Sequence, residues 1–335
     1  MANLRFSYFI ERAKAANLPR VWKMAGDIGR QFRKPRLNVF CDMLWSAARF
    51  DCAFQDFQDW DFAILSRAER RTYITHPMSN RYALQLNTDK HANRDLSDKS
   101  RFNVRFGDVI GRQWLDVREA SENELEAFLA RFTDVMVKVP DSLGGKGIER
   151  IRTKDVADVA RFRAERMRNR QFLVEEFLQQ HPHMAELNSS SVNTMRIASY
   201  NDGTRVHILC RALRIGAGGD VDNFSGGGMY TMLSPEGTAL YPAFDDANAT
   251  HGIHPLSGVP IVGFEVPLFA EAIEAVKAAA QRIPEVPYVG WDVAIAPDRP
   301  VLIEGNYNTG VFQAKPSVSG LRRGLLPVYR AAIGH

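Results

Sequence analysis

The sequence has few cysteines and no long apolar run. Its 335 residues include three cysteines, Cys41, Cys52 and Cys210, and none stands in a CxxC pair or a Cys/His spacing. This argues against a disulfide framework and against a zinc site. No apolar stretch approaches the roughly 18 residues of a membrane span, and charges interrupt the N-terminal stretch where a signal peptide would be apolar. We therefore expect a cytoplasmic protein in a reducing compartment.

Familiar catalytic constellations are also missing. The eight histidines are scattered, and no Ser-His-Asp or Cys-His arrangement stands out. The composition is otherwise ordinary for a globular protein, with 45% hydrophobic and 24% charged residues. The length allows two or three packed units with a sizeable core.

The basic residues are concentrated at the N-terminus. Residues 1 to 36 hold nine Lys or Arg against two acidic residues, whereas the rest of the chain has 34 basic and 37 acidic residues. Apolar residues such as Phe6, Phe9 and Trp22 are interleaved with these charges, so the arm could contact an anionic membrane surface, a nucleic acid or an acidic partner. We favour the alternative of a solvated helical face packed on the main body by its apolar side. No nucleic-acid partner is expected, and a peripheral contact with an anionic surface stays open.

Secondary-structure patterns change near residue 95. Up to that point the chain is predicted to be mainly helical, with aromatic-rich stretches and polar breaks. Capped helix starts follow at Ser97-Asp98-Lys99 and at Ser121-Glu122-Asn123-Glu124. The later strands are predicted at Val135–Val139, Phe172–Phe177, Thr194–Tyr200 and Val206–Arg214, and a helix at Val266–Gln281. The last two of these strands would pair around the turn Asn201–Gly203, and strands joined by hairpins and bracketed by helices indicate an α+β fold.

The two final predicted strands carry oxygen-bearing side chains on one face. Val289–Ile295 and Val301–Asn306 are separated by a short polar turn and should form a hairpin. Glu304 and Asn306 are two residues apart and point the same way from a strand, while Asp292 lies on the partner strand. Carboxylate and amide oxygens are hard ligands that suit Mg²⁺. The alternative is an ordinary hairpin whose polar residues face water.

A glycine-rich loop follows the strand that ends near residue 139. Gly144, Gly145 and Gly147 permit positive φ and let backbone N–H groups approach phosphate oxygens, and Lys146 and Lys138 add positive charge. The loop is not a Walker A motif because Gly147 follows Lys146, and no G-x-G-x-x-G opens a helix after the first strand. Taken alone, this loop could equally be a plain hairpin turn.

Taken in order, these features resemble the ATP-grasp superfamily. The matching residues are Lys99 at a helix start, Lys138 before the glycine-rich loop, Val174–Leu178, and Asp292, Glu304 and Asn306 on the last two strands. More narrowly, the chain is similar to the sugar-transfer-associated ATP-grasp family at Val192–Ile197, Arg211–Gly216, Asp222–Gly228 and Ile303–Asn306. The resemblance covers roughly residues 90 to 330.

The resemblance implies an α+β ATP-grasp fold, in which two α/β subdomains grip ATP between antiparallel sheets. This domain would occupy residues 96–335, with its first subdomain at about 130–180 and its second at about 181–335. A helical, basic region at residues 1–95 would precede it. That region departs from the small α/β unit that usually opens the superfamily fold.

The resemblance also implies the residues that bind ATP and Mg²⁺. Those that would hold the phosphates are Lys99, Lys138 and the loop of Gly144, Gly145, Lys146 and Gly147. Those that would hold adenine through their backbones are Glu175, Glu176, Phe177 and Leu178. His183 could reach the ribose, although an isolated histidine is more often a surface residue. Asp292, Glu304 and Asn306 would bind one or two Mg²⁺ ions, with Glu304 as the bridging ligand.

Three arginines, Arg196, Arg211 and Arg214, would serve the chemistry. We favour Arg196 and Arg214 for the transferred phosphate or the oxyanion. Arg211 and Arg214 are three residues apart on a strand and should face opposite sides unless a bulge intervenes, so one of them is expected to be structural. The acceptor pocket would be lined by Asn193, Asp222, Asn223, Gly227 and Gly228. For the segment from Asp222 onward, a turn linking two strands is the alternative.

The activity implied is ATP-dependent carboxylate–amine ligation through an acyl phosphate, acting on a sugar-, glycan- or peptide-related metabolite. The expected cofactors are ATP and Mg²⁺, and the expected partners are a small-molecule carboxylate and an amine. Two alternatives stay open, a small-molecule kinase and a nucleotide-binding scaffold without turnover. The fold alone does not identify the carboxylate or the amine.

Overall fold

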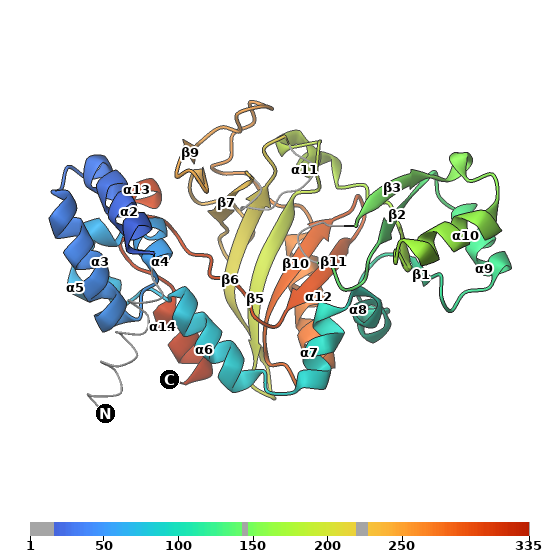
Figure 1. Ribbon diagram of the computed structural model, residues 1–335, viewed down its shortest axis with the longest axis horizontal. Coiled ribbons are helices and arrows are strands. Elements are labelled where there is room, and N and C mark those ends of the chain that lie inside the picture. Colours follow the sequence, from blue (N-terminus) through green and yellow to red (C-terminus); the bar gives the residue numbers. More distant parts are fainter. Residues whose placement is uncertain (1–16, 143–146, 219–226, 335) are drawn as a thin grey trace. The chain divides into compact units, whose positions relative to one another are not determined.

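The computed structural model describes residues 17–142, 147–218 and 227–334 (Figure 1). The chain is divided into two compact units. The sheet unit is Ala83–Thr309, and the helical unit joins Met1–Tyr82 to Gly310–His335. This division differs from the predicted boundary near residue 95, because the end of the chain returns to the N-terminal helices.

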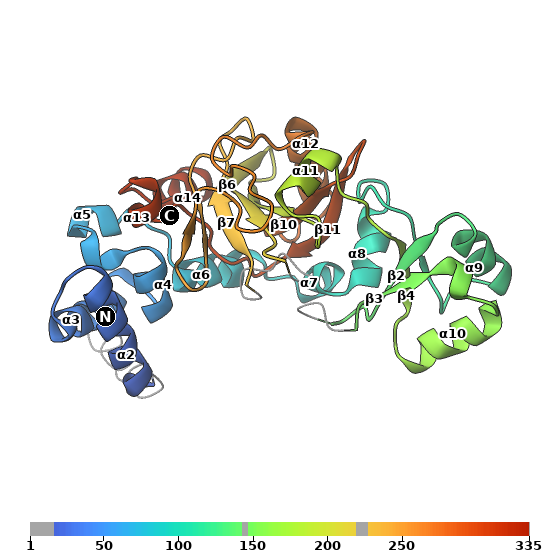
Figure 2. The same ribbon diagram turned by 90° about the horizontal axis from the view of Figure 1, so that it is seen from above.

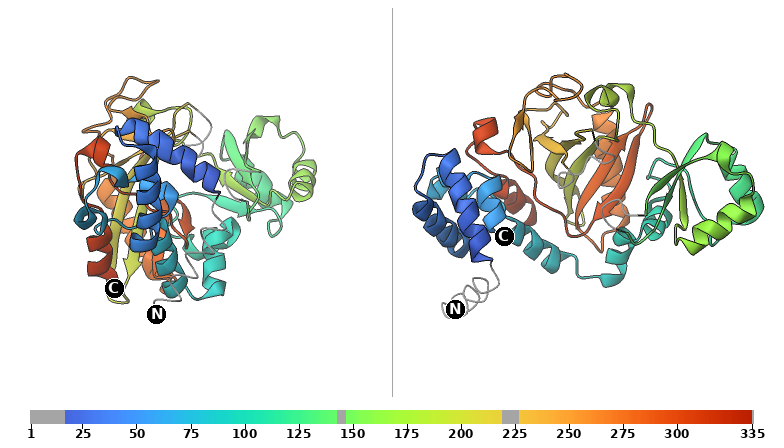
Figure 3. Two further views of the ribbon diagram at one scale, coloured as in Figure 1. Left: turned by 60° about the vertical axis from the view of Figure 1, so that its left-hand side comes forward. Right: turned by 45° about the horizontal axis from the view of Figure 1, so that its top comes forward.

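The helical unit is built from helices, as predicted for the N-terminal region. α2 (Leu18–Gln31) and α3 (Arg36–Phe50) pack together through apolar residues at helical spacing and can be followed in Figure 3. The other elements are α4 (Phe54–Asp59), the 3₁₀ turn η1 (Phe62–Ile64), α5 (Arg67–Arg70), α6 (His76–Leu86), α13 (Pro316–Ser319) and α14 (Leu326–Ile333).

Contacts between residues remote in sequence hold the C-terminal segment in the helical unit. Lys315 Nζ lies 3.1 Å from the carboxylate of Asp61, and both side chains are buried. Gln313 Nε2 donates to the carbonyl of Ile74 at 2.7 Å. These partners lie far apart along the chain, so no local pattern predicts that residues 310–335 belong to this unit.

A small antiparallel sheet forms the first layer of the sheet unit. Its order is β1 (Trp114–Asp116), β4 (Leu173–Glu176), β2 (Asp134–Lys138) and β3 (Glu149–Arg152). Figure 2 labels β2, β3 and β4 of this sheet. α9 (Glu122–Leu129) and α10 (Val159–Arg168) supply Leu125 and Phe162 to a core with Val135, Val137 and Val174 of the strands.

A larger antiparallel sheet carries the last predicted hairpin. Its order is β11 (Pro300–Asn306), β10 (Tyr288–Ile295), β5 (Thr194–Asn201), β6 (Val206–Ile215), β7 (Met229–Met232), β8 (Ala243–Asp245) and β9 (Thr250–His251). α12 (Phe269–Arg282) packs on β5, β10 and β11, and α11 (Pro182–Leu187) precedes β5. Residues such as Ile197, Leu213 and Trp291 are fully buried in the core of this sheet.

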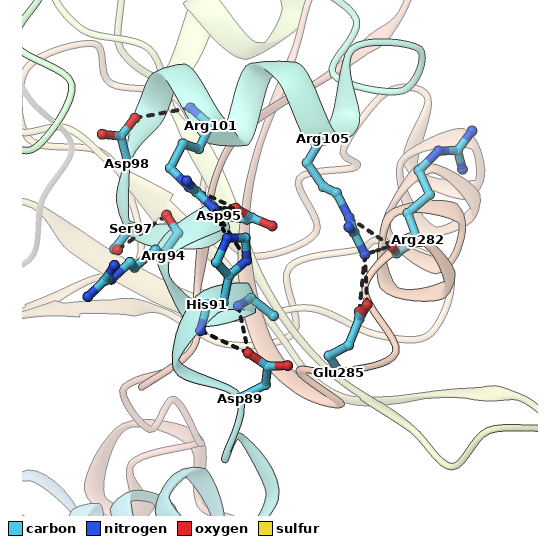
Figure 4. A network of polar contacts seen from close by, with 11 residues as sticks. Asp89, His91, Arg94, Asp95, Ser97, Asp98, Arg101, Arg105, Arg282 and Glu285 are labelled. Atoms are coloured by element: carbon cyan, nitrogen blue, oxygen red, sulfur yellow. Dashed lines mark hydrogen bonds and ion pairs between the residues drawn. The ribbon is translucent and has the colours of Figure 1, made fainter.

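Two short helices, α7 (Lys90–Ser97) and α8 (Lys99–Phe106), lie beside β11 and are fixed by polar contacts (Figure 4). Asp98 caps α8 by accepting from Arg101 N at 3.0 Å, and Arg101 Nε donates to Asp95 on α7 at 2.8 Å. Arg105 Nη2 donates to the carbonyl of Arg282 at 2.7 Å. These bonds set the position of Lys99, the first residue of α8.

The predicted elements that surround the site are confirmed with small shifts at their ends. β5 and β6 pair as a hairpin and β10 and β11 pair as a second one. Ser121 forms the capping box that opens α9. No helix among the described residues is long and apolar enough to cross a membrane.

Candidate active site

Asp292 is the centre of a buried charged cluster on the large sheet. It lies on β10 directly opposite Arg196 on β5, and only 3% of the residue is exposed. Arg196 donates to both carboxylate oxygens, with Nη2 3.0 Å from Oδ2, and Arg214 Nη2 on β6 lies 3.0 Å from the same oxygen. Burial alone would raise the pKa of Asp292, but the two guanidinium groups hold it below its ordinary value. The carboxylate therefore stays ionised.

Glu304 on β11 is the cross-strand neighbour of Asp292. Burial raises the pKa of Glu304, and the adjacent Asp292 carboxylate raises it further. Asn306 follows two residues later, and its Nδ2 donates to the carbonyl of Gly290 at 3.3 Å and to Glu304 Oε1 at 3.4 Å. A register shift between Asp292 and Val293 brings Glu304 opposite Asp292, and strand alternation places Asn306 on the same face as Glu304.

This set fits a hard divalent cation such as Mg²⁺. The Asp292 carboxylate raises the pKa of Glu304, because two adjacent negative charges repel each other. A bound cation would relieve this repulsion. The amide oxygen of Asn306 would be a third ligand of the same hard type. Among the described residues, no three His, Cys, Asp or Glu side chains are grouped as for a metal, so the metal prediction depends on these two carboxylates and one amide.

Lys99 lies where charged groups of the two sheets meet. Burial lowers the pKa of Lys99, the Glu304 carboxylate opposes this effect, and the Lys138 ammonium adds to it. Lys138 comes from β2 of the small sheet and Glu304 from β11 of the large one, so the charge of Lys99 is influenced by a group from each sheet. Lys99 Nζ donates to the carbonyl of Ser142 at 2.5 Å, immediately before the glycine-rich loop. The two predicted phosphate-binding lysines and Glu304 are therefore coupled electrostatically through Lys99.

A second buried carboxylate, Glu175 on β4, holds Lys138. Lys138 Nζ and Arg112 Nη2 lie 2.5 and 3.1 Å from its oxygens, and Asn103 Nδ2 donates to it at 2.8 Å. Burial opposes ionisation, but Arg112 and Lys138 outweigh it and lower the pKa of Glu175 to about 2. Arg112 also donates to the carbonyl of Leu302 on β11. One arginine thus links the small sheet to the large one beside the site.

Sequence reasoning missed Arg112 and assigned only backbone groups to Glu175. Arg112 precedes β1 and belongs to no recognisable motif. Its partners Glu175 and Leu302 are distant in sequence. The burial of Glu175 beside Lys138 depends on the pairing of β2 with β4, so the sequence alone does not reveal this contact. The predicted contact of Lys138 with phosphate stays a prediction, and Glu175 is the group that holds this lysine in place.

The segment predicted to hold adenine lies at the end of β4. The side chain of Glu176 accepts from Gln113 N at 2.9 Å and lies 2.6 Å from Arg299 Nη2. Phe177, which is 37% exposed, and Leu178 follow the strand in the loop that leads to α11. Binding of adenine by the backbone of this segment stays a prediction.

Two other predicted residues have partners within the protein. The ring of His183 stacks on Phe264 with centroids 4.4 Å apart. Asn193 is fully buried, donates to the carbonyl of Met184 at 2.8 Å and accepts from Gly216 N at 3.2 Å. A buried amide with these bonds braces the chain between α11 and β6 and does not line an open pocket.

The structure separates Arg211 from the other two arginines. The register between β5 and β6 runs without a break from Arg214 to Arg211, so these side chains point to opposite faces of the sheet. Arg214 shares a face with Arg196 and Asp292, whereas Arg211 lies on the face of Leu213. Burial lowers the pKa of Arg211. Arg196 and Arg214 are therefore brought to the carboxylate cluster and Arg211 is not.

The glycine-rich segments are described only in part. Gly144, Gly145, Lys146, Asp222 and Asn223 lie outside the described residues. Gly147 has a φ of 70°, and an added Cβ would lie 2.6 Å from Val139 Cγ2, so this position needs glycine. Gly227 also has positive φ, and the buried Gly228 directly precedes β7.

Comparisons with known proteins identify the family of the chain. The family model described as sugar-transfer associated ATP-grasp matches residues 69–325. No curated protein matches the chain. Among solved structures, the ATP-grasp ligase PsnB complexed with minimal precursor is 16% identical with a TM-score of 0.44, covering 84% of this chain and 77% of that one. D-alanyl-alanine synthetase A from Vibrio cholerae O1 is 12% identical with a TM-score of 0.39, covering 73% and 62%.

Likenesses at these identities and scores say nothing about substrate. The family match spans most of the chain, including Lys99, Lys138 and the Asp292–Glu304 pair. The predicted ATP-grasp fold is confirmed by this match. The chain belongs to the sugar-transfer-associated ATP-grasp family.

Proposed function

We propose that the protein is an ATP-dependent carboxylate–amine ligase that works through an acyl phosphate. Membership of the ATP-grasp family supports an ATP-using enzyme. The observation that carries the proposal concerns Lys99, whose pKa is affected by Lys138 of one sheet and by Glu304 of the other. Two cations for phosphate and two carboxylates for a metal ion thereby meet within one site.

In the first step, a carboxylate oxygen of the substrate attacks the γ-phosphorus of ATP, the bond to the β-phosphate oxygen breaks, and ADP leaves. Lys99 and Lys138 bind the phosphate oxygens, and Glu175 keeps Lys138 in position. Asp292, Glu304 and Asn306 would hold Mg²⁺, which neutralises phosphate charge when bound. No protein nucleophile is required, consistent with the lack of a Ser-His-Asp or Cys-His constellation.

In the second step, an amine attacks the carbonyl carbon of the acyl phosphate and a tetrahedral oxyanion forms. The C–O bond to phosphate then breaks, phosphate leaves, and the nitrogen loses a proton to solvent. A guanidinium placed in advance at this charge stabilises it without reorganisation. Arg214 is our candidate for this role, supported by its fixed position: its Nε and Nη2 donate to Thr194 Oγ1 at 2.9 and 2.6 Å, and its Nη2 lies 3.0 Å from the Asp292 carboxylate. Arg196 lies beside it and would bind the transferred phosphate.

The proposal is tested by incubating the purified protein with ATP and Mg²⁺ in the presence of carboxylate pools, with and without amine pools. We expect ADP release, an amide detected by mass spectrometry, and a hydroxamate when hydroxylamine replaces the amine, because hydroxylamine traps an acyl phosphate. ADP with a phosphorylated product and no amide would assign a kinase. ATP binding without any ADP release would assign a scaffold.

A matched pair of variants tests the metal assignment. Glu304→Gln should abolish turnover, with a loss of at least about 10²-fold, while leaving the fold intact. Glu271→Gln makes the same exchange at an exposed position of α12 and should leave turnover unchanged. Normal activity in Glu304→Gln would rule out the metal role of Glu304.

A further inference from the structure

The α2–α3 hairpin exposes large apolar side chains. Leu18, Trp22, Leu37 and Trp45 are 43%, 40%, 61% and 36% exposed, whereas such residues are usually buried. Leu37 and Trp45 are eight residues apart, which places them on the same side of α3. The buried residues of α3, such as Val39, lie on the opposite side. Trp45 also meets the buried ring of Phe50 edge-on at 5.1 Å and has the Arg67 guanidinium 4.8 Å from its ring centroid, so Leu37 is the freer of the two side chains.

Basic side chains accompany this apolar surface. Residues 17–50 contain seven Lys or Arg against two Asp. On α2, Arg20, Lys23 and Arg30 are exposed along one side of the helix, about 130° around its axis from Leu18 and Trp22, and Arg30 also pairs with Asp27. The turn that leads to α3 adds the exposed Arg33 and Lys34. We use the name hairpin surface for these five cations and five further residues, Leu18, Trp22, Arg36, Leu37 and Trp45.

Arg36 is held in place on the hairpin surface by aromatic residues. Its guanidinium lies 5.4 Å from the centroid of the Trp22 ring, and Trp22 meets Phe40 edge-on at 5.2 Å. Gly26 makes this possible, because an added Cβ there would lie 2.4 Å from Arg36 Nη2. A cation, an indole and the exposed Leu37 are thus arranged together in the folded protein.

We propose that the hairpin surface binds membranes that contain anionic lipids. Cationic side chains attract anionic lipid headgroups. Trp side chains are enriched at the membrane–water interface, and exposed Leu side chains insert at the boundary between headgroups and acyl chains. A nucleic acid would use the cations and the aromatic rings but would leave Leu18 and Leu37 without a role. The combination of excess positive charge with exposed aliphatic residues therefore favours a lipid surface.

Vesicle sedimentation with the full chain tests this proposal. The protein should sediment with vesicles of phosphatidylcholine and phosphatidylglycerol and stay in solution with phosphatidylcholine alone, and high salt should weaken the binding. The triple variant Arg20→Glu, Lys23→Glu, Arg33→Glu should lose at least about tenfold in affinity. The control Arg152→Glu, Lys154→Glu, Arg168→Glu makes the same charge change at exposed positions of the sheet unit and should bind as the unmodified protein does.

A second variant tests the apolar contribution without a change of charge. Leu37→Ser, at a position that is 61% exposed, should fold normally and lose several-fold in affinity for the anionic vesicles. Equal binding by the two triple variants would overturn the proposal, as would equal binding to vesicles with and without phosphatidylglycerol. Tight binding of RNA or DNA without vesicle binding would assign the surface to nucleic acid instead.

Discussion

Glu175→Gln tests the buried charges that join the two sheets. The exchange keeps the shape of the side chain and leaves Arg112 and Lys138 without their shared counter-charge. Removing one partner of a buried ion pair costs about 3 to 5 kcal/mol. The pKa of Glu175, lowered from 4.5 to about 2, corresponds to about 3 kcal/mol by itself. We therefore expect Glu175→Gln to lose about 3 to 4 kcal/mol of unfolding free energy at neutral pH.

This loss should depend on pH in one direction. Because the pKa of Glu175 is lower in the folded state, its ionised form contributes its full stabilisation above about pH 4.5 and progressively less as the pH falls toward 2. Glu175→Gln lacks the titrating group. The difference in unfolding free energy between the two proteins should therefore be largest at neutral pH and should shrink through this window.

Urea denaturation over a range of pH measures the difference, with hydrogen exchange followed in peptides of β2 and β4. The peptide readout is needed because two compact units do not have to unfold in one transition. Glu176→Gln is the matched control on the same strand. Its partner Arg299 has a side chain that is 41% exposed, so the expected loss is only about 1 kcal/mol. Equal losses in the two variants, or a loss that does not change with pH, would refute the reasoning.

Two further pairs of variants test the faces and the packing of the large sheet. Arg214→Met should lower turnover by about 10²-fold or more, whereas Arg211→Met on the opposite face should leave kcat within about twofold; ADP release measures both, and equal losses would contradict the assignment. Gly305→Ala should cost about 1 to 3 kcal/mol in thermal unfolding, because an added Cβ would lie 2.8 Å from Leu96 Cδ2. Gly252→Ala, where an added Cβ meets nothing within 4 Å, is its control, and similar losses in both would contradict the packing account.

The hairpin that carries Asp292, Glu304 and Asn306 could be predicted from the sequence because its determinants are local. Side chains two residues apart on a strand share a face in any sheet, so Glu304 and Asn306 had to point the same way. The pairing of Glu304 with Asp292 is not fixed by the turn, because a register shift between Asp292 and Val293 is needed to bring Glu304, in place of Ile303, opposite Asp292. Capped helix starts such as that of Lys99 are local signals of the same kind.

The rest of the site depends on contacts between residues that are remote in sequence. Arg112 meets Glu175 and Leu302 only after both sheets have formed, and no spacing or motif marks it beforehand. The same reason explains the division of the chain into units, since the return of residues 310–335 depends on pairs such as Lys315 with Asp61. The choice between Arg211 and Arg214 also required the register of β6 against β5, which a strand pattern alone does not give.

The ion pairs of Asp292 decide which carboxylate is the better probe of metal binding. Asp292→Asn would remove a predicted ligand and would also leave Arg196 and Arg214 buried without their counter-charge, at a cost of about 3 to 5 kcal/mol. Inactivity of that variant would not separate a lost ligand from a disordered site. Glu304 is a better probe than Asp292, because burial and the Asp292 carboxylate raise its pKa. Replacing it by the neutral Gln therefore changes the charge of the folded protein less than Asp292→Asn does. Loss of turnover in Glu304→Gln with unchanged unfolding free energy would therefore point to the ligand role itself.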